Sequence, residues 1–277
     1  MIDTIATVAD NREIAQGYKL LTLNFSQPIN ARAGQFVMLR AHDAFEPLLR
    51  RALAIYRVES ATRLSFLYQV MGRGTQALAL LEPGGRVDAL IPLGNGWADF
   101  YAADEAKEKR AIVVAGGIGS ASVLMLCEEL RQQKIATQIF FGAANEHVAQ
   151  GCGLEDFRAL HLPLTITTDD GSLGQRGFVT APLERFLQAG GNQNAAIYTC
   201  GPWVMMKRVA EIAAQFDTPC YASLEAPMGC GFGVCVGCVV AMREADPKSY
   251  GAYKRVCTDG SIFPAEAIKW EVAAMTH

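Results

Sequence analysis

Residues 110–122 read RAIVVAGGIGSAS, and this stretch decides the fold expected for the middle of the chain. Residues 111–115 have the apolar composition of a buried strand. The glycine-rich residues 116–119 follow, and apolar side chains then recur at helical spacing over residues 123–130. A strand joined to a helix by such a turn is typical of nucleotide-binding α/β folds, because the N–H groups at the start of the helix can face a pyrophosphate.

The glycine motif is incomplete, since Ser122 stands where G-x-G-x-x-G has its last glycine. Glycines in a tight turn can also serve packing alone. The segments that follow favour the nucleotide interpretation, because further strands are expected at residues 136–141, 164–168 and 195–200, with a helix at 204–215. This alternation predicts a doubly wound parallel sheet, and we assign residues 102–223 to an NAD-binding α/β domain.

Residues 1–101 have a different pattern of short apolar and aromatic runs separated by turn residues. Strands are expected at residues 18–25, 35–40, 52–58 and 64–70. The expected breaks are Asp10-Asn11, Pro28, Gly34 and Pro83-Gly84-Gly85. Several short strands at this spacing predict an antiparallel β-barrel.

Residues 224–277 contain MGCGFGVCVGCVV, from Met228 to Val240, with three cysteines and a fourth cysteine further on. The spacing C-x4-C-x2-C with a distant fourth cysteine is typical of plant-type 2Fe-2S ligation, so the predicted metal ligands are Cys230, Cys235, Cys238 and Cys257. Glycines at 229, 231, 233 and 237 can take positive backbone torsions that turn N–H groups toward the sulfurs. A structural zinc site is the alternative, although zinc usually draws its cysteines as two close pairs.

The composition excludes some classes of function. The 277 residues carry 25 Lys and Arg against 28 Asp and Glu, a formal charge of -3, and no basic block, which argues against nucleic-acid binding. The first residues do not resemble a signal peptide, and no apolar run is long enough to span a bilayer. We therefore expect no membrane association and a reduced, cytoplasmic protein, in which Cys127, Cys152, Cys200 and Cys220 are buried small hydrophobes.

An iron–sulfur cluster and a nicotinamide nucleotide transfer different numbers of electrons in each step. A hydride carries two electrons and a cluster accepts one at a time, so a flavin is expected between them. The first segment is the expected place for it. Arg50 and Arg51 suit a pyrophosphate. The run Gly72-Arg73-Gly74-Thr75 is a further candidate contact, because its small residues come before a helix expected at 76–80. Paired arginines are also ordinary on protein surfaces, and that alternative stays open.

Taken together, several stretches resemble one family along nearly the whole chain. It is similar to the iron–sulfur and flavin electron-transfer subunit of NAD-dependent (class 1B) dihydroorotate dehydrogenase, within the ferredoxin–NADP reductase superfamily. The matching stretches are PLLRRALAI (47–55), YQVMGRGTQAL (68–78), PGGRVDALIPLGNGW (83–97), AGGIGSAS (115–122), TDDGSLGQRGFVT (168–180), YTCGP (198–202) and YKRVCTDGSIF (253–263).

The resemblance implies a flavin-binding barrel at 1–101, the nucleotide domain at 102–223 and a small 2Fe-2S module at 224–277, with FAD, NAD and the cluster as cofactors. It implies Cys200 as the catalytic residue, near the nicotinamide with Gly201 and Pro202. It also places Gly116, Gly117 and Gly119 at the nicotinamide nucleotide. The implied FAD contacts are Arg51, Ala52, Leu53, Ala54, Tyr68, Gln69, Val70, Gly74 and Thr75.

Three positions depart from the superfamily pattern. Ala54 stands where a hydroxyl residue is usual, and Ala52 and Ser122 stand where proline is common. A missing hydroxyl near the flavin removes one hydrogen bond, worth ~0.5 to 1.5 kcal/mol, and is expected to alter the flavin potential more than binding. Glu146 follows the second expected strand of the nucleotide domain, and no Arg or Lys comes before Arg158, so NAD is expected rather than NADP.

The predicted function is an electron-transfer subunit that links a separate FMN-containing catalytic subunit to NAD through the cluster and FAD. With the typical partner, a heterotetramer would convert dihydroorotate and NAD+ to orotate and NADH in pyrimidine synthesis. One alternative is an NAD(P)H-oxidising subunit of another flavoprotein or ferredoxin complex. An alternative of another class is a non-catalytic scaffold stabilised by zinc.

Overall fold

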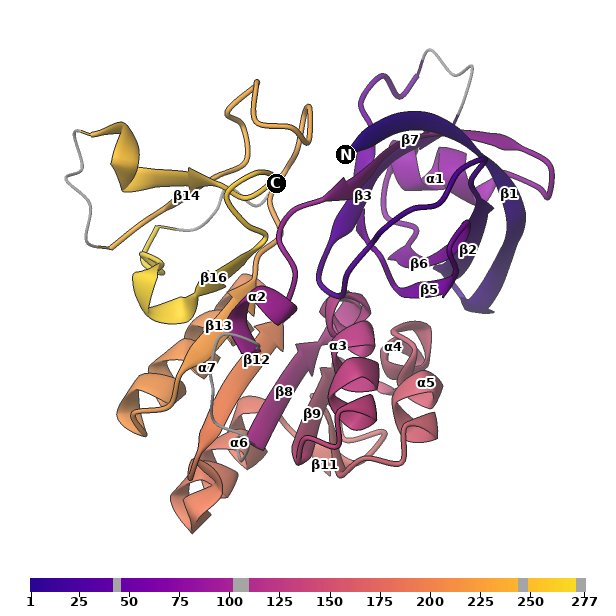
Figure 1. The fold of residues 1–277 in the computed structure, drawn as a ribbon. Helices are drawn as coiled ribbons and strands as arrows, with labels where there is room; N and C mark the ends of the chain where they lie inside the picture. The colour runs from indigo at the N-terminus through magenta and orange to yellow at the C-terminus, as the bar shows by residue number, and fades with distance from the viewer. Residues whose placement is uncertain (42–45, 102–109, 244–248, 273–277) are drawn as a thin grey trace.

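The computed structural model describes residues 1–41, 46–101, 110–243 and 249–272, and it has three parts (Figure 1). A curled antiparallel sheet is followed by a sheet flanked by helices, and a small cysteine-containing segment packs beside both. Residues 102–109, at the predicted boundary between the first two domains, lie outside the described residues. The domain boundaries therefore stay predictions, whereas the expected fold class is confirmed.

The first sheet has seven strands, and every pairing in it is antiparallel. Their order is β4-β3-β7-β1-β2-β6-β5, and the short helix α1 (Arg73–Ala79) follows β6. The strands are β1 (Ile2–Ala15), β2 (Tyr18–Asn24), β3 (Phe36–Ala41), β4 (Arg51–Ala54), β5 (Arg57–Ser60), β6 (Arg63–Gln69) and β7 (Arg86–Leu93).

Two expectations for this sheet were wrong. Asp10 and Asn11 were expected to break the chain, but they lie within β1, where a register shift between Val8 and Asp10 accommodates them. The run 52–58 is two strands, because β4 pairs with β3 at one edge of the sheet and β5 pairs with β6 at the other. The buried residues Ile55 and Tyr56 carry the chain between these edges.

The second sheet confirms the doubly wound arrangement. Its order is β11-β10-β9-β8-β12-β13-β16, and all its pairings are parallel except that of β16. The strands are β8 (Arg110–Gly116), β9 (Thr137–Ala143), β10 (Leu164–Thr168), β11 (Gln175–Arg176), β12 (Ala195–Cys200) and β13 (Cys220–Ser223). The helices are α2 (Ala98–Tyr101), α3 (Ser120–Gln132), α4 (Glu146–Gly151), α5 (Leu154–Ala159), α6 (Thr180–Phe186) and α7 (Trp203–Gln215), with a single π turn at Leu187–Gly191.

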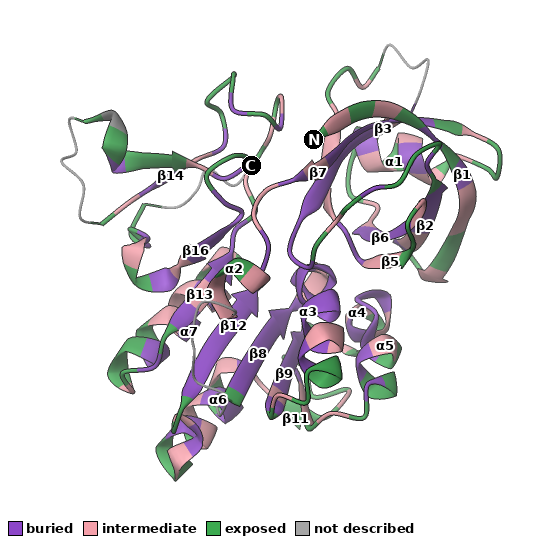
Figure 2. Ribbon diagram, in the orientation of Figure 1, coloured by how far each residue is buried: buried purple, intermediate pink, exposed green. Residues whose placement is uncertain are grey.

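The period-two pattern of β8 explains why helices cover both faces. Ala111, Val113 and Ala115 point into the core beneath α3, α4 and α5. Ile112 and Val114 point into the core that α6 and α7 cover. Figure 2 shows the resulting buried layer in the middle of this domain.

The third part is small and is attached to both others. β14 (Val239–Ala241) and β15 (Tyr253–Arg255) form a hairpin, and β16 (Ile262–Pro264) joins the second sheet by pairing antiparallel with β13. Short 3-10 turns of this part lie at Tyr250–Ala252 and Ala265–Ala267, and another lies at Gly117–Gly119 between β8 and α3. The cysteine segment therefore shares a sheet with the nucleotide domain, which the sequence patterns did not predict.

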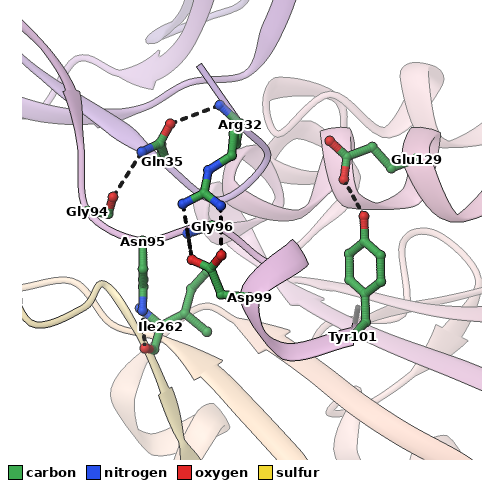
Figure 3. Close-up of polar contacts among 9 residues, drawn as sticks. All are labelled: Arg32, Gln35, Gly94, Asn95, Gly96, Asp99, Tyr101, Glu129 and Ile262. Carbon is green, nitrogen blue, oxygen red and sulfur yellow. Dashed lines mark hydrogen bonds and ion pairs between the residues drawn. The ribbon is translucent and has the colours of Figure 1, made fainter. Parts of the chain in front are cut away.

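Figure 3 shows the polar contacts at the junction of the three parts. Arg32 of the first part binds both carboxylate oxygens of Asp99, at 2.6 and 3.1 Å. Asn95 hydrogen-bonds both the backbone N–H and the carbonyl of Ile262 in β16, each at 2.9 Å. The indole of Trp97, fully buried, donates to the carbonyl of Ser122 at 2.8 Å. The loop after β7 thus holds all three parts together.

Replacement of Asn95 by alanine should destabilise the attachment of β16. The variant leaves the Ile262 N–H and carbonyl without their side-chain partner, at a cost of about 1 to 3 kcal/mol. Urea unfolding measures this difference. Asn24→Ala is the matched control, because Asn24 is exposed and its side chain makes no hydrogen bond with the residues that the structure describes. Equal stability of the two variants would contradict the role given to Asn95.

Candidate functional site

A cavity of about 380 Å3 lies where the three parts meet, and we term it the interdomain cavity. The first part contributes residues of β4 and β6, and the nucleotide domain contributes residues from the ends of β12 and β13. Of the predicted site residues, the ones that line this cavity are Ala52, Leu53, Ala54, Tyr68, Gln69 and Cys200.

The curled sheet positions β4 and β6, which form one wall of the interdomain cavity. β4 pairs on one side only, with β3, so its other edge is free to border the cavity. The hydroxyl of Tyr68 donates to Asn11 Oδ1 at 3.1 Å, and burial raises the pKa of Tyr68 to about 12. The small side chains of Ala52 and Ala54 leave the wall flat and apolar. Such a wall suits one face of a planar aromatic ring.

Four other predicted flavin residues lie outside the lining of this cavity: Arg51, Val70, Gly74 and Thr75. Arg51 and Gly74 nevertheless meet, since a Cβ at Gly74 would overlap the Arg51 guanidinium. The Thr75 hydroxyl accepts hydrogen bonds from the N–H groups of Met71 and Gly72, at 2.9 and 3.2 Å. Thr75 therefore shapes the turn that brings Gly74 against the arginine.

Three polar residues that the sequence patterns did not assign to the site also line the cavity, together with the predicted Cys200. They are Ser122 and Ser223 of the nucleotide domain and Glu225, which comes two residues after the end of β13. Burial raises the pKa of the Cys200 thiol, the nearby Glu225 charge raises it further, and the Ser122 and Ser223 hydroxyls oppose this. Glu225 is an exposed residue that lines the cavity, and desolvation by the protein around it raises its pKa. Only their position at or just after the end of a strand could have suggested Ser223 and Glu225.

A second cavity, of about 690 Å3, lies at the carboxyl ends of β8, β9, β10 and β12, and we term it the strand-end cavity. The sheet order reverses between β8 and β12, and open α/β sheets bind ligands at such a point. Gly116 and Gly117 line this cavity. Gly117 has a φ of 54°, and no atom lies within 4 Å of where its Cβ would be, so its backbone is open to a ligand.

Gly119 does not line the strand-end cavity. A Cβ at this position would lie 2.5 Å from the Gly201 nitrogen, so the glycine permits close packing of α3 against the end of β12. This packing brings the two cavities together, because Cys200 lines the interdomain cavity and Pro202 lines the strand-end cavity.

The acidic residue that follows a strand and lines the strand-end cavity is not the one expected. Glu146 is absent from its lining, and its N–H donates to the Ser172 hydroxyl at 2.8 Å. Asp169, which follows β10, lines the cavity instead. Burial, and then the charge of Asp170, raises the pKa of Asp169. The sequence patterns did not single out Asp169, because a sequence does not show which strand end borders the cavity.

The four cysteines predicted as metal ligands lie as two pairs. Cys230 and Cys235 are within hydrogen-bond reach of each other, and so are Cys238 and Cys257. Within the described ranges, no three metal-ligating side chains converge as for a single ion. Two thiolates for each of two irons is the ligand arrangement of a 2Fe-2S cluster, so this donor set fits that group.

The backbone of the cysteine loop, residues 229–238, turns toward these sulfurs. Gly231 and Gly233 have φ values of 82° and 88°, as the sequence predicted for them, and Val236 is also left-handed at 54°. Gly229 and Gly237 are not left-handed. Burial raises the pKa of Cys230, but N–H groups of Cys235, Phe232 and Val234 lower it to about 6. Burial and Cys238 raise the pKa of Cys257 to about 12, while the Gly233 N–H opposes this.

The other four cysteines, Cys127, Cys152, Cys200 and Cys220, are buried, as predicted. Across the described ranges, no helix combines the length and apolarity needed to cross a membrane.

Comparison with known proteins agrees with this architecture. A solved chain of an NADH-dependent reduced ferredoxin–NADP oxidoreductase superposes with a TM-score of 0.79 at 25% identity, covering 97% of this chain and 91% of that one. A ferredoxin–NADP+ reductase from Neisseria gonorrhoeae, at 16% identity, shares the fold, with a TM-score of 0.62 and coverage of 77% and 91%. The chain therefore has the fold of the ferredoxin reductases.

The relatives narrow this class to one family. The chain is 35% identical over 253 residues to the dihydroorotate dehydrogenase B (NAD(+)) electron transfer subunit of Desulforamulus reducens, covering 90% of this chain and 92% of that protein. It is 36% identical over 262 residues to that of Geobacillus kaustophilus, covering 94% and 95%. Residues 225–269 match the iron–sulfur cluster binding domain of dihydroorotate dehydrogenase B. The chain belongs to the family of dihydroorotate dehydrogenase B electron transfer subunits.

Alkylation should separate the two classes of cysteine in iron-free protein. Iodoacetamide at pH 7 is expected to modify Cys235, which is exposed, and Cys230, whose thiolate predominates above its pKa of about 6. Cys127 and Cys220 should stay unmodified because they are buried. Peptide mass spectrometry measures the sites, and loading with iron and sulfide should protect Cys230 and Cys235. Modification of Cys127 before Cys235 would contradict the structure.

Proposed function

We propose that this protein is the electron-transfer subunit of an NAD-dependent dihydroorotate dehydrogenase, with FAD in the interdomain cavity, NAD(H) in the strand-end cavity and a 2Fe-2S cluster on the four cysteines. The holoenzyme would convert dihydroorotate and NAD+ to orotate and NADH. The partner would be a separate FMN-containing catalytic subunit, in a cytoplasmic heterotetramer. The family membership supports this assignment.

One observation carries the proposal: the lining of the interdomain cavity leads directly to both of the other sites. Pro227 and Met228 line the cavity, and Cys230 follows Met228 by two residues. On the other side, Cys200 lines this cavity and Pro202, also two residues away, lines the strand-end cavity. The chain is thus arranged for electrons to enter at one side of the interdomain cavity and leave at the other.

When bound, the flavin exchanges two electrons with the nicotinamide and one at a time with the cluster. The chain's own residues supply position and environment. Ala52, Leu53 and Ala54 would face the flavin ring, and Tyr68 and Gln69 would border it. Arg51, with Gly74 and Thr75 shaping the adjacent turn, would meet the pyrophosphate, and Cys200 would contact the nicotinamide. The N–H groups of the cysteine loop would stabilise the charge on the cluster sulfurs.

The exposed surface of the cysteine loop is the proposed docking face for the catalytic subunit. Phe232, Val234 and Val236 are 44%, 74% and 54% exposed, although each is apolar. An exposed apolar group of this kind is typical of an interface, and electron transfer to a partner requires that the cluster lies near one.

Asp169 is proposed to select NAD over NADP. A carboxylate can accept hydrogen bonds from the ribose hydroxyls of NAD and repels the 2'-phosphate of NADP. The charge on Lys207, which also lines the strand-end cavity and makes no ion pair with a described residue, would favour the diphosphate.

The variant Asp169→Ser should lose preference for NADH. The lost hydrogen bonds to a charged group are expected to lower kcat/KM for NADH by about tenfold, and kcat/KM for NADPH should rise as the repulsion is removed. Steady-state dye reduction with each nucleotide measures both. Asp170→Asn is the control, because Asp170 carries the same charge but bonds Ser172 outside the cavity lining. An equal effect of both variants would point to general electrostatics and not to ribose contact.

The function itself is tested by assay of the chain alone and with a catalytic subunit. The isolated, flavin-loaded chain should reduce an artificial dye with NADH and form no orotate. Addition of the FMN-containing dihydroorotate dehydrogenase subunit of the same organism should give NAD+-dependent orotate formation. Orotate formation by the isolated chain would contradict the subunit assignment, and so would the absence of dye reduction.

Two observations favour a second class of partner. The similarity to a ferredoxin–NADP oxidoreductase chain extends over 97% of this protein, and Ala54 departs from the pattern of the typical enzyme. If another flavoprotein or a ferredoxin is the partner, the isolated chain will still reduce dyes with NADH, but the dihydroorotate dehydrogenase subunit will not couple to it. Affinity purification of the tagged chain from its own organism under anaerobic conditions distinguishes the two.

A further inference from the structure

The two sides of the interdomain cavity differ in hydrogen-bonding capacity. The β4 side presents Ala52, Leu53 and Ala54, whose side chains offer no donor. The nucleotide-domain side presents the hydroxyls of Ser122 and Ser223 next to the thiol of Cys200. A ligand in this cavity therefore meets side-chain hydroxyl donors on one side and none on the β4 side.

These two hydroxyls form a pair that the fold holds firmly. Ser122 Oγ donates to Ser223 Oγ at 3.1 Å, and the two residues are 6% and 4% exposed. Ser122 lies in the first turn of α3, where its carbonyl accepts the hydrogen bond from Trp97. Ser223 ends β13 and is the register partner of Cys200 in the parallel ladder. The pair is therefore fixed by a helix, two strands and a buried indole.

The pair has two hydroxyl hydrogens, and one of them is used in the bond from Ser122 to Ser223 Oγ. Within the described part of the chain, the Cys200 sulfur, which lies within reach of both hydroxyls, is the acceptor offered to the other hydrogen, and a thiol sulfur is a weak acceptor. A stronger acceptor placed in the cavity would receive that hydrogen bond instead.

We propose that Ser122 and Ser223 act as a hydroxyl pair that donates a hydrogen bond to the flavin ring and makes its reduction more favourable. This inference rests on the proposed function, which places the flavin in this cavity. Reduction adds electron density to the nitrogen and oxygen atoms of the ring, so a fixed donor stabilises the reduced form more than the oxidised form. Ala54 cannot supply such a bond. Ser122, which stands where proline is common in the superfamily, provides a hydroxyl instead.

The test is the two-electron midpoint potential of the bound flavin, measured by anaerobic absorbance against a reference dye. Ser223→Ala removes the donor and is expected to lower the reduced-to-oxidised ratio at a fixed applied potential by up to about tenfold, which is ~30 mV for a two-electron couple. Ser122→Ala removes the group that orients Ser223 and should give a smaller shift in the same direction. Ser223→Thr keeps the hydroxyl and should restore the original potential.

Ser120→Ala is the matched control. Ser120 lies on the same helix and is fully buried, but its hydroxyl donates to the Cys152 carbonyl at 2.7 Å and lies outside the cavity lining. Loss of the Ser120 hydroxyl should lower the free energy of unfolding and leave the midpoint potential of the flavin unchanged. A purely structural role of the serine pair would make Ser122→Ala and Ser223→Ala behave like this control.

The flavin content and the midpoint potential of these variants distinguish failure of the hydroxyl pair from failure of the proposed function. An unchanged potential in Ser122→Ala and Ser223→Ala, with full flavin content, would overturn the hydroxyl pair and leave the electron-transfer role intact. If Ser223→Ala does not retain flavin, Ser122→Ala decides the question by the same measurement. A wild-type protein that binds no flavin would overturn the proposed function itself.

Discussion

The close approach of Gly119 to Cys200 and Gly201 is the contact on which the site depends. It is possible only without a side chain at Gly119, since a Cβ there would lie 2.5 Å from the Gly201 nitrogen. The contact brings the start of α3 against the end of β12, at the point where the sheet order reverses. As a result, Ile118, Ala121 and Ser122 border the interdomain cavity, while Gly116 and Gly117 border the strand-end cavity. One glycine thus sets the geometry at which two cavities meet.

The loop after β7 provides the second constraint. Asn95 and Trp97 fix β16 and α3 to the end of the curled sheet, and Arg32 with Asp99 adds an ion pair on the exposed side. The exposed pair contributes little, because solvent screens it. The hydrogen bonds of Trp97, which is buried, and of Asn95, which is half-buried, matter more, since a carbonyl left without its partner away from water is costly. This explains how a small cysteine segment can be held next to the cavity without a large core of its own.

The sequence predicted the fold well where the signal is local. The strand-turn-helix pattern of residues 110–132 depends on near neighbours, and the structure has it almost as expected. β1 was missed because Asp10 and Asn11 resemble a turn, and only pairing with β2 and β7 overrides that preference. The cysteine spacing predicted a ligand set that lies as two pairs. Ser223, Glu225 and Asp169 were missed because their importance depends on which strand ends meet, and this is a property of topology.

The central claim is that electrons from NADH pass through the interdomain cavity to the cluster on the cysteine loop. Anaerobic titration of the isolated protein with NADH, followed by electron paramagnetic resonance of the cluster and absorbance of the flavin, tests it directly. The account predicts a reduced 2Fe-2S signal in the wild type, and in Cys235→Ser a flavin that is still bleached by NADH with no cluster signal. A wild-type cluster that stays oxidised while the flavin is fully reduced would contradict the account.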